Sequence, residues 1–146
     1  MKTFNIKLIA LALGFAFSAG AMAASMTRAD YKAGKDTISA EYKTAKAGCD
    51  SLTANAKDIC RAEAKGKERV ARAQLEDSYK PTPKAQYKAL VAISSADYAV
   101  SKEKCDDLSG DFKKTCIKDA KLVRTTAVAD AKVKTNTENY TLQKDS

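Results

Sequence analysis

The sequence predicts an all-α protein made of two tandem disulfide-stapled antiparallel helical hairpins, four helices in total. Three observations lead to this prediction: the chain contains an internal duplication, its apolar residues recur at helical spacing, and its four cysteines form two equally spaced pairs. The hairpins fit either an up-down four-helix bundle or a tandem arrangement around a proline joint, and the sequence leaves both open.

The duplication appears when the chain is aligned with itself at an offset of 56 residues. Of the 45 positions from Ala29 to Ala73, 17 are identical in the segment from Ala85 to Ala129, with no gap. The identical positions include the tyrosines and cysteines of the two copies, which are Tyr31, Tyr42, Cys49 and Cys60 in the first and Tyr87, Tyr98, Cys105 and Cys116 in the second. We therefore expect two copies of one structural unit.

The N-terminal segment 1–23 has the three parts of a signal peptide. Lys2 and Lys7 come first, an apolar run of about ten residues follows, and Ala21 with Ala23 fits the A-x-A cleavage rule. The run is shorter than the roughly 20 residues that span a bilayer. We expect cleavage after Ala23, with cleavage after Ala21 as the alternative, and export to the periplasm or secretion without stable membrane insertion.

Residues 24–80 form the first predicted hairpin. Thr27 and Asp30 make a capping box at the start of its first helix, and the turn is expected near Ala54 and Asn55. One stripe of the first helix carries Tyr31, Tyr42 and Cys49 beside Ile38, and one stripe of the second carries Leu52, Ala56, Cys60, Ala64, Ala71 and Leu75.

Residues 81–134 form the second predicted hairpin. Pro81 breaks the chain after the first hairpin, Thr82 caps the next helix with Pro83 at its first position, and Gly110 marks the turn. The matching stripes carry Tyr87, Tyr98 and Cys105 and then Leu108, Phe112, Cys116, Ala120, Ala127 and Ala131. The polar run 135–146 has no apolar period and predicts a flexible tail.

The cysteines are expected to form two structural disulfides, because an even number behind a signal peptide is typical of an oxidising compartment. Four cysteines permit three pairings. The duplication favours Cys49 with Cys60 and Cys105 with Cys116, because each unit then carries its own staple. Each pair also lies about five residues either side of its turn, so the two cysteines are level on antiparallel helices.

Metal, redox and catalytic chemistry are not expected. Zinc, iron–sulfur and thioredoxin-type sites use closely spaced cysteines or clustered ligands, and this chain has neither CxxC nor any His. It also lacks a Gly-rich phosphate loop and a GxSxG elbow, so no catalytic, cofactor or metal residues are assigned. Asp106, Asp107 and Asp111 are expected to cap helices, with weak cation binding as the alternative.

Charged and aromatic side chains are expected to be structural. Opposite charges recur at the spacing of a solvated helix face: Glu63 with Lys67, Glu68 with Arg72, Glu76 with Lys80, and Asp130 with Lys134. The tyrosines at 31, 42, 87 and 98 share a face with the cysteines, which favours a core position over a binding platform.

The net charge is +8, and loss of Lys2 and Lys7 with the signal peptide leaves +6. This charge divides equally at Lys80, whereas a nucleic-acid binder typically concentrates it on one stripe or arm. We therefore expect no nucleic acid as partner, while an anionic component of the cell envelope remains compatible with the charge.

A resemblance accompanies these features. The elements Tyr-Lys-Ala, Cys-Asp-x-Leu, Lys-x-x-Cys and Glu/Asp-Ala-Lys behind a signal peptide resemble small Ala/Lys-rich exported proteins of proteobacteria, sometimes labelled TolA-like or cell-envelope biogenesis proteins. The resemblance covers most of the mature chain and carries over no catalytic or binding residue.

We expect a non-enzymatic periplasmic interaction or scaffold protein that acts in envelope maintenance or stress. Its partner would be an envelope protein or a polyanionic envelope component. One alternative is a chaperone-like or cargo-binding module with an apolar groove between the hairpins. The other is a cationic binder of envelope polyanions.

Overall fold

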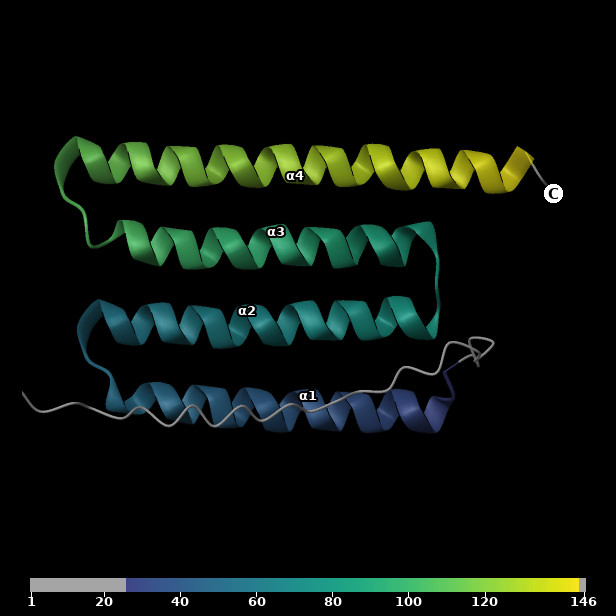
Figure 1. The fold of residues 1–146 in the computed structure, drawn as a ribbon, viewed down its shortest axis with the longest axis horizontal. Helices are drawn as coiled ribbons and strands as arrows, with labels where there is room; N and C mark the ends of the chain where they lie inside the picture. Colours follow the sequence, from purple (N-terminus) through teal and green to yellow (C-terminus); the bar gives the residue numbers. More distant parts are fainter. Residues whose placement is uncertain (1–25, 145–146) are drawn as a thin grey trace, which may run out of the picture.

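Four long helices follow one another in the computed structural model, which describes residues 26–144 (Figure 1). They are α1 (Arg28–Gly48), α2 (Ala54–Tyr79), α3 (Pro83–Cys105) and α4 (Gly110–Lys144), with a short 3-10 helix η1 (Cys49–Ser51) after α1. The described residues contain no strand, so the all-α class with two helical hairpins is confirmed. The predicted signal peptide, 1–23, lies outside the described residues.

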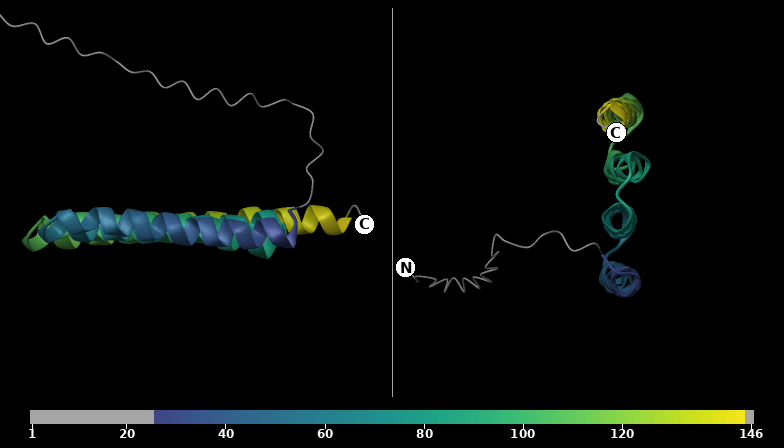
Figure 2. Two further views of the ribbon diagram at one scale, coloured as in Figure 1. Left: turned by 90° about the horizontal axis from the view of Figure 1, so that it is seen from below. Right: turned by 90° about the vertical axis from the view of Figure 1, so that its right-hand side faces the viewer.

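The helices lie side by side in one layer and alternate in direction (Figures 1 and 2). α2 packs against α1 and α3, and α3 packs against α2 and α4. Between residues 26 and 144, α1 contacts neither α3 nor α4, and α2 does not contact α4. The expected up-down order is therefore present as an open row, which leaves two broad faces and two outer edges uncovered.

The seams between the helices are thin and are built mainly from small side chains. The buried apolar residues are Ile38, Cys49, Ala64, Ala85, Ala89, Ala96, Cys105 and Ala131. Small residues let neighbouring helices approach closely, but a single layer has no central volume in which large side chains can gather. Several large apolar residues are consequently exposed, the most extreme being Phe112 at 79%.

Both predicted helix caps are present. The Thr27 hydroxyl accepts a hydrogen bond from the Asp30 N–H at 3.1 Å, and the Asp30 carboxylate accepts one from the Thr27 N–H at 3.2 Å. The Thr82 hydroxyl accepts from the Ala85 N–H at 3.0 Å, with Pro83 in the first turn. These bonds satisfy N–H groups that the first turn of a helix leaves unpaired, so they fix where α1 and α3 begin.

The two hairpin turns use the same left-handed backbone position. Ala54 has φ of +50° and Gly110 has φ of +57°, and the two residues are equivalent at the offset of 56. Glycine adopts this region freely, whereas a residue with a Cβ atom is strained there by about 1–2 kcal/mol. The first turn therefore carries strain that the second avoids.

Exchanging these residues is expected to change stability in opposite directions. Ala54→Gly should raise the free energy of unfolding by about 0.5–1 kcal/mol, because it removes the strain, and Gly110→Ala should lower it by about 1 kcal/mol. Nothing lies within 4 Å of a Cβ atom placed on Gly110, so backbone strain is isolated from packing. Urea unfolding followed by circular dichroism measures both changes, and changes of equal sign would contradict the explanation.

α4 continues to Lys144, past the boundary at residue 134 that the sequence predicts. Residues 135–144, which the sequence predicts as part of a flexible tail, have a helical backbone. Thr135 is only 4% exposed, its hydroxyl donates to the Ala131 carbonyl at 2.9 Å, and it lies beside Pro83 and Tyr87 of α3. Thr135 and Asn136, which are polar, line the contact with α3, so an apolar period did not mark this part of the helix.

None of the helices between residues 26 and 144 has both the length and the apolar character that a membrane crossing requires.

Candidate functional site

The two hairpin turns lie at the same end of the row (Figure 1), and a disulfide staples each hairpin next to its turn. The disulfides join Cys49 to Cys60 and Cys105 to Cys116, with Cα atoms 5.6 and 5.7 Å apart. The predicted pairing is confirmed, and it includes every cysteine of the chain. Because such bonds persist only where thiols are not kept reduced, the protein belongs to an oxidising, extracytoplasmic environment.

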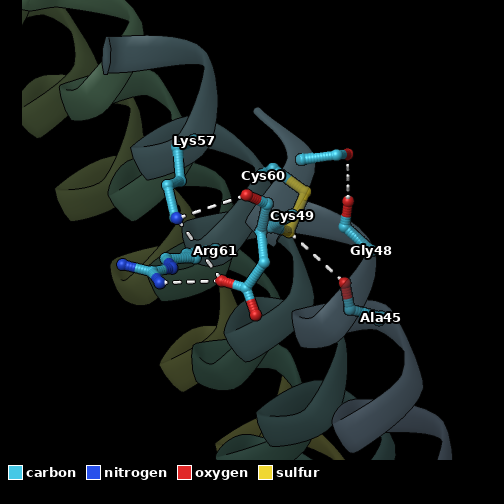
Figure 3. Close-up of a disulfide and its surroundings, with 8 residues drawn as sticks. Ala45, Gly48, Cys49, Lys57, Cys60 and Arg61 are labelled. Carbon is cyan, nitrogen blue, oxygen red and sulfur yellow. Dashed lines mark hydrogen bonds and ion pairs between the residues drawn. A yellow bond between two sulfur atoms is a disulfide. The ribbon is translucent and has the colours of Figure 1, made fainter. Parts of the chain in front are cut away.

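An ion pair accompanies each staple. The Asp50 carboxylate accepts a hydrogen bond from Arg61 Nη2 at 3.0 Å and lies 3.4 Å from Lys57 Nζ. Figure 3 shows Lys57 and Arg61 beside the staple of Cys49 and Cys60. The hydrogen bonds from Arg61 and Lys57 lower the pKa of Asp50 below its usual value. The equivalent residues of the second hairpin, Asp106 and Lys113, pair at 3.0 Å. In both copies this pair links the turn to the following helix.

Asp50→Asn is expected to remove a small pH-dependent part of the stability. The pKa of Asp50 is lower in the folded protein than in the unfolded chain, where it is about 4. Its ion pairs therefore contribute their full stabilisation of the fold when the pH is above this unfolded pKa. That contribution is lost as the pH falls below this value and through the folded pKa. Thermal melts should therefore show the wild type losing more stability than the variant on acidification below pH 4, and parallel curves would contradict this.

The tyrosines lie in two separate seams and do not form one aromatic platform. The Tyr31 ring stacks on Tyr79 with centroids 4.4 Å apart, and its hydroxyl donates to Glu76 at 2.5 Å. The hydrogen bond to the Glu76 carboxylate, with burial, raises the pKa of Tyr31 above its usual value. Tyr87 and Tyr98 line the seam between α3 and α4 and are half-buried.

Each of the three aspartates near the second turn has a partner. Asp106 pairs with Lys113, Asp107 accepts from Asn55 Nδ2 at 2.8 Å, and Asp111 pairs with Lys114. Within residues 26–144 there is no cluster of three side chains that could hold a metal ion. Of the predicted i to i+4 pairs, Glu68 and Arg72 form one at 2.9 Å.

Asn55 has a structural role that the sequence did not reveal. Its side-chain amide donates to the Glu103 carbonyl at 2.7 Å as well as to Asp107, so it joins the turn of the first hairpin to that of the second. The sequence gives no signal for this contact, because its partners lie 48 and 52 residues further along the chain.

A groove of about 730 Å³ runs between α2 and α3 on one face of the row. Gly66 and Ala96 line it and are in close contact: a Cβ atom on Gly66 would lie 2.9 Å from the Cβ atom of Ala96. Its apolar lining comprises Val70, Ala71, Ile93 and Val100, and its charged lining comprises Glu63, Lys67, Asp97 and Lys104. Of these eight lining residues, the predicted helical stripes contained only Ala71.

A second groove of about 430 Å³ lies beside the first, between α3 and α4. Ile93 and Asp97 line both grooves, which places them on the ridge that separates the two. The Ile93 side chain is 37% exposed at this ridge. One face of the layer therefore presents α3 as a ridge, with Ile93 and Asp97 on it, between two parallel hollows.

The lining of these grooves suits non-covalent contact with a polypeptide, since it combines apolar side chains with charges of both signs. No family model, curated protein or solved structure matches the chain. The groove between α2 and α3 is thus the candidate site on geometric grounds.

Proposed function

We propose that the chain is a non-enzymatic periplasmic interaction protein whose groove between α2 and α3 binds an amphipathic helix of a partner protein. The single observation that carries the proposal is the groove itself, which is apolar and lies between two antiparallel helices. A third helix in such a groove buries its apolar stripe against two helices at once. The predicted signal peptide and the two disulfides support the periplasm as the compartment.

The charges of the groove favour a protein helix over a polyanion. Glu63 and Lys67 belong to α2, and Asp97 and Lys104 belong to α3, so each wall carries one acid and one base. A lipopolysaccharide or peptidoglycan site would concentrate positive charge, whereas this groove is balanced. An apolar helical stripe flanked by both acidic and basic residues complements such a lining.

Binding of a model helix tests the proposal. The probe is a fluorescein-labelled amphipathic peptide of about 20 residues, roughly 30 Å long as a helix, with a leucine stripe flanked by Glu and Lys. We expect its fluorescence anisotropy to rise with the oxidised protein at micromolar concentrations. Ile93→Lys should weaken binding at least tenfold, because it replaces the exposed apolar side chain between the two grooves with a charge.

Phe112→Lys is the matched control, because it adds the same charge to an exposed apolar side chain outside both grooves. It should bind the peptide as the wild type does. A scrambled peptide of the same composition should bind at least tenfold more weakly. Equal binding of the scrambled peptide would favour the chaperone-like alternative, and unchanged binding by Ile93→Lys would overturn the groove as the site.

A further inference from the structure

The row of four helices ends in two unpartnered edges (Figure 2). Between residues 26 and 144, α4 packs only on α3, toward which it turns Ala131. Leu122 and Val133 lie nine and two residues from Ala131, which places them about 180–200° around the helix from it. Their side chains are 64% and 66% exposed, so the outer edge of α4 presents large apolar groups to solvent.

This outer edge corresponds to the face by which α2 binds α3. The offset of 56 relates four positions of α2 to four of α4: Gly66 to Leu122, Val70 to Thr126, Ala73 to Ala129, and Asp77 to Val133. On α2, Gly66 is buried against Ala96 of α3. The equivalent stripe on α4 carries no charged residue at these positions, and no other helix of the described residues packs on it.

The outer edge of α1 corresponds in turn to the face by which α3 binds α2. Ala85, Ala89 and Ala96 form one stripe of α3 and are 8%, 6% and 8% exposed. At the same offset α1 has the identical residues Ala29, Ala33 and Ala40, and all three are exposed. The chain thus shows both halves of its central interface a second time, one at each end of the row.

We propose that copies of this chain join head to tail, with the outer edge of α4 of one copy packed antiparallel on the outer edge of α1 of the next. In the register of the α2–α3 seam, Leu122 faces Ala40 and Val133 faces Ala29 of the adjoining copy. The two joined surfaces differ, so each added copy leaves one free edge of each kind. The assembly therefore extends as an open row of helices, as in other repeat architectures.

Leu122 sets the spacing of the new seam. At the equivalent position of α2, a Cβ atom would lie 2.9 Å from Ala96, so that seam requires Gly66. With leucine there, the joined helices lie at the usual interaxial distance of about 8–10 Å. The alanines of α1 face the large side chains of α4, and this alternation of large and small residues fills the wider gap.

The polar contact at the turns is also compatible with this joint. Within one chain, Asn55 donates to Asp107. At the offset of 56, Asn55 corresponds to Asp111 on α4, and Asp107 corresponds to Ser51 beside α1. The acceptor therefore takes the place of the donor, and the donor takes the place of the acceptor. In the joint, the Ser51 hydroxyl of one copy, which donates to the Gly48 carbonyl at 3.2 Å within the chain, turns to donate to the Asp111 carboxylate of the other.

Sedimentation velocity tests the proposal on the exported chain, residues 24–146, with both disulfides formed. The mean mass of the wild type should rise with concentration, without a plateau at the dimer, up to about 1 mM, the range of weak interfaces. Ala40→Glu and Leu122→Glu should each weaken association at least tenfold and sediment as monomers. An equimolar mixture of the two should form a 1:1 dimer, because one intact α4 edge still meets one intact α1 edge.

Val123→Glu is the control, since Val123 is 67% exposed but lines the seam with α3 instead of the outer edge. It should assemble like the wild type. A wild type that stays monomeric throughout would overturn the proposal, as would dimers of Ala40→Glu alone, which would indicate pairing of two α4 edges. Formation of the mixed dimer also shows that both variants are folded, and the joint does not depend on the proposed groove function.

Discussion

Reduction of both disulfides is expected to lower the melting temperature of the protein by roughly 20 °C or more. Each bond closes a loop between cysteines 11 positions apart, which contributes about 3 kcal/mol on the chain-entropy model. The contribution of the two disulfides together is comparable to the whole free energy of unfolding of a typical domain, which is about 5–15 kcal/mol. For a domain of this size, each kcal/mol of lost stability lowers the melting temperature by about 3–6 °C, so the expected drop is large.

The thin seams explain why the staples matter so much here. Among the described residues, the largest side chains that are less than 2% exposed belong to Cys49 and Cys105 themselves. The other buried positions are mostly alanines, each of which removes little apolar surface from water. Reduction therefore loosens the turn end of each hairpin, where little else holds the helices together.

Thermal melts by circular dichroism, with and without reductant, measure this effect. A variant with alanine at all four cysteine positions serves as the control, because its melt should not respond to reductant and should match the reduced wild type. Replacing only Cys49 and Cys60 should cost about half as much. Identical melts of the oxidised and reduced wild type would show that the staples do not stabilise the fold.

Gly66→Leu is expected to lower the free energy of unfolding by about 2 kcal/mol or more. A side chain at this position meets the Cβ, Cα and carbonyl oxygen of Ala96 at 2.9, 3.5 and 3.9 Å, and none of these atoms can rotate away. Forcing extra groups into a closed seam typically costs about 1–3 kcal/mol. Leucine is also a better helix former than glycine by about 0.8 kcal/mol, so any loss arises at the interface and not in α2 itself.

Gly48→Leu is the matched control for this substitution. Nothing lies within 4 Å of a Cβ atom on Gly48, at the end of α1, so leucine is tolerated there. We expect this variant to unfold within about 1 kcal/mol of the wild type. Urea titration of both variants gives the comparison, and equal stability of the two would contradict the close contact between Gly66 and Ala96.

Local features of the fold were predictable because each acts over a few residues. The capping threonines, Thr27 and Thr82, mark helix starts through hydrogen bonds that span three residues. The cysteine pairing followed from equal spacing within each hairpin. The end of α4 was not predictable in this way, because Thr135 is held by its packing against α3 and not by a local signal.

The candidate site was less accessible from the sequence. The expected stripes of Tyr and Cys describe the seams within each hairpin, whereas the groove uses Val70, Ile93 and Val100 from a different side of α2 and α3. A single glycine inside a predicted helix, Gly66, was the one available signal of a close approach. Its partner was not identifiable, since a glycine does not specify which helix it meets.

By itself, the sequence determined the helices, their caps and the disulfide pairing, because these depend on spacing within one helix or one hairpin. The tertiary structure alone decided that the hairpins join through Gly66 and Ala96 into an open row. A helix in such a row has two seams, one on each side, and its periodicity shows which residues are apolar without showing which neighbour they face. The groove and the uncovered edges of α1 and α4 follow from that choice of neighbours.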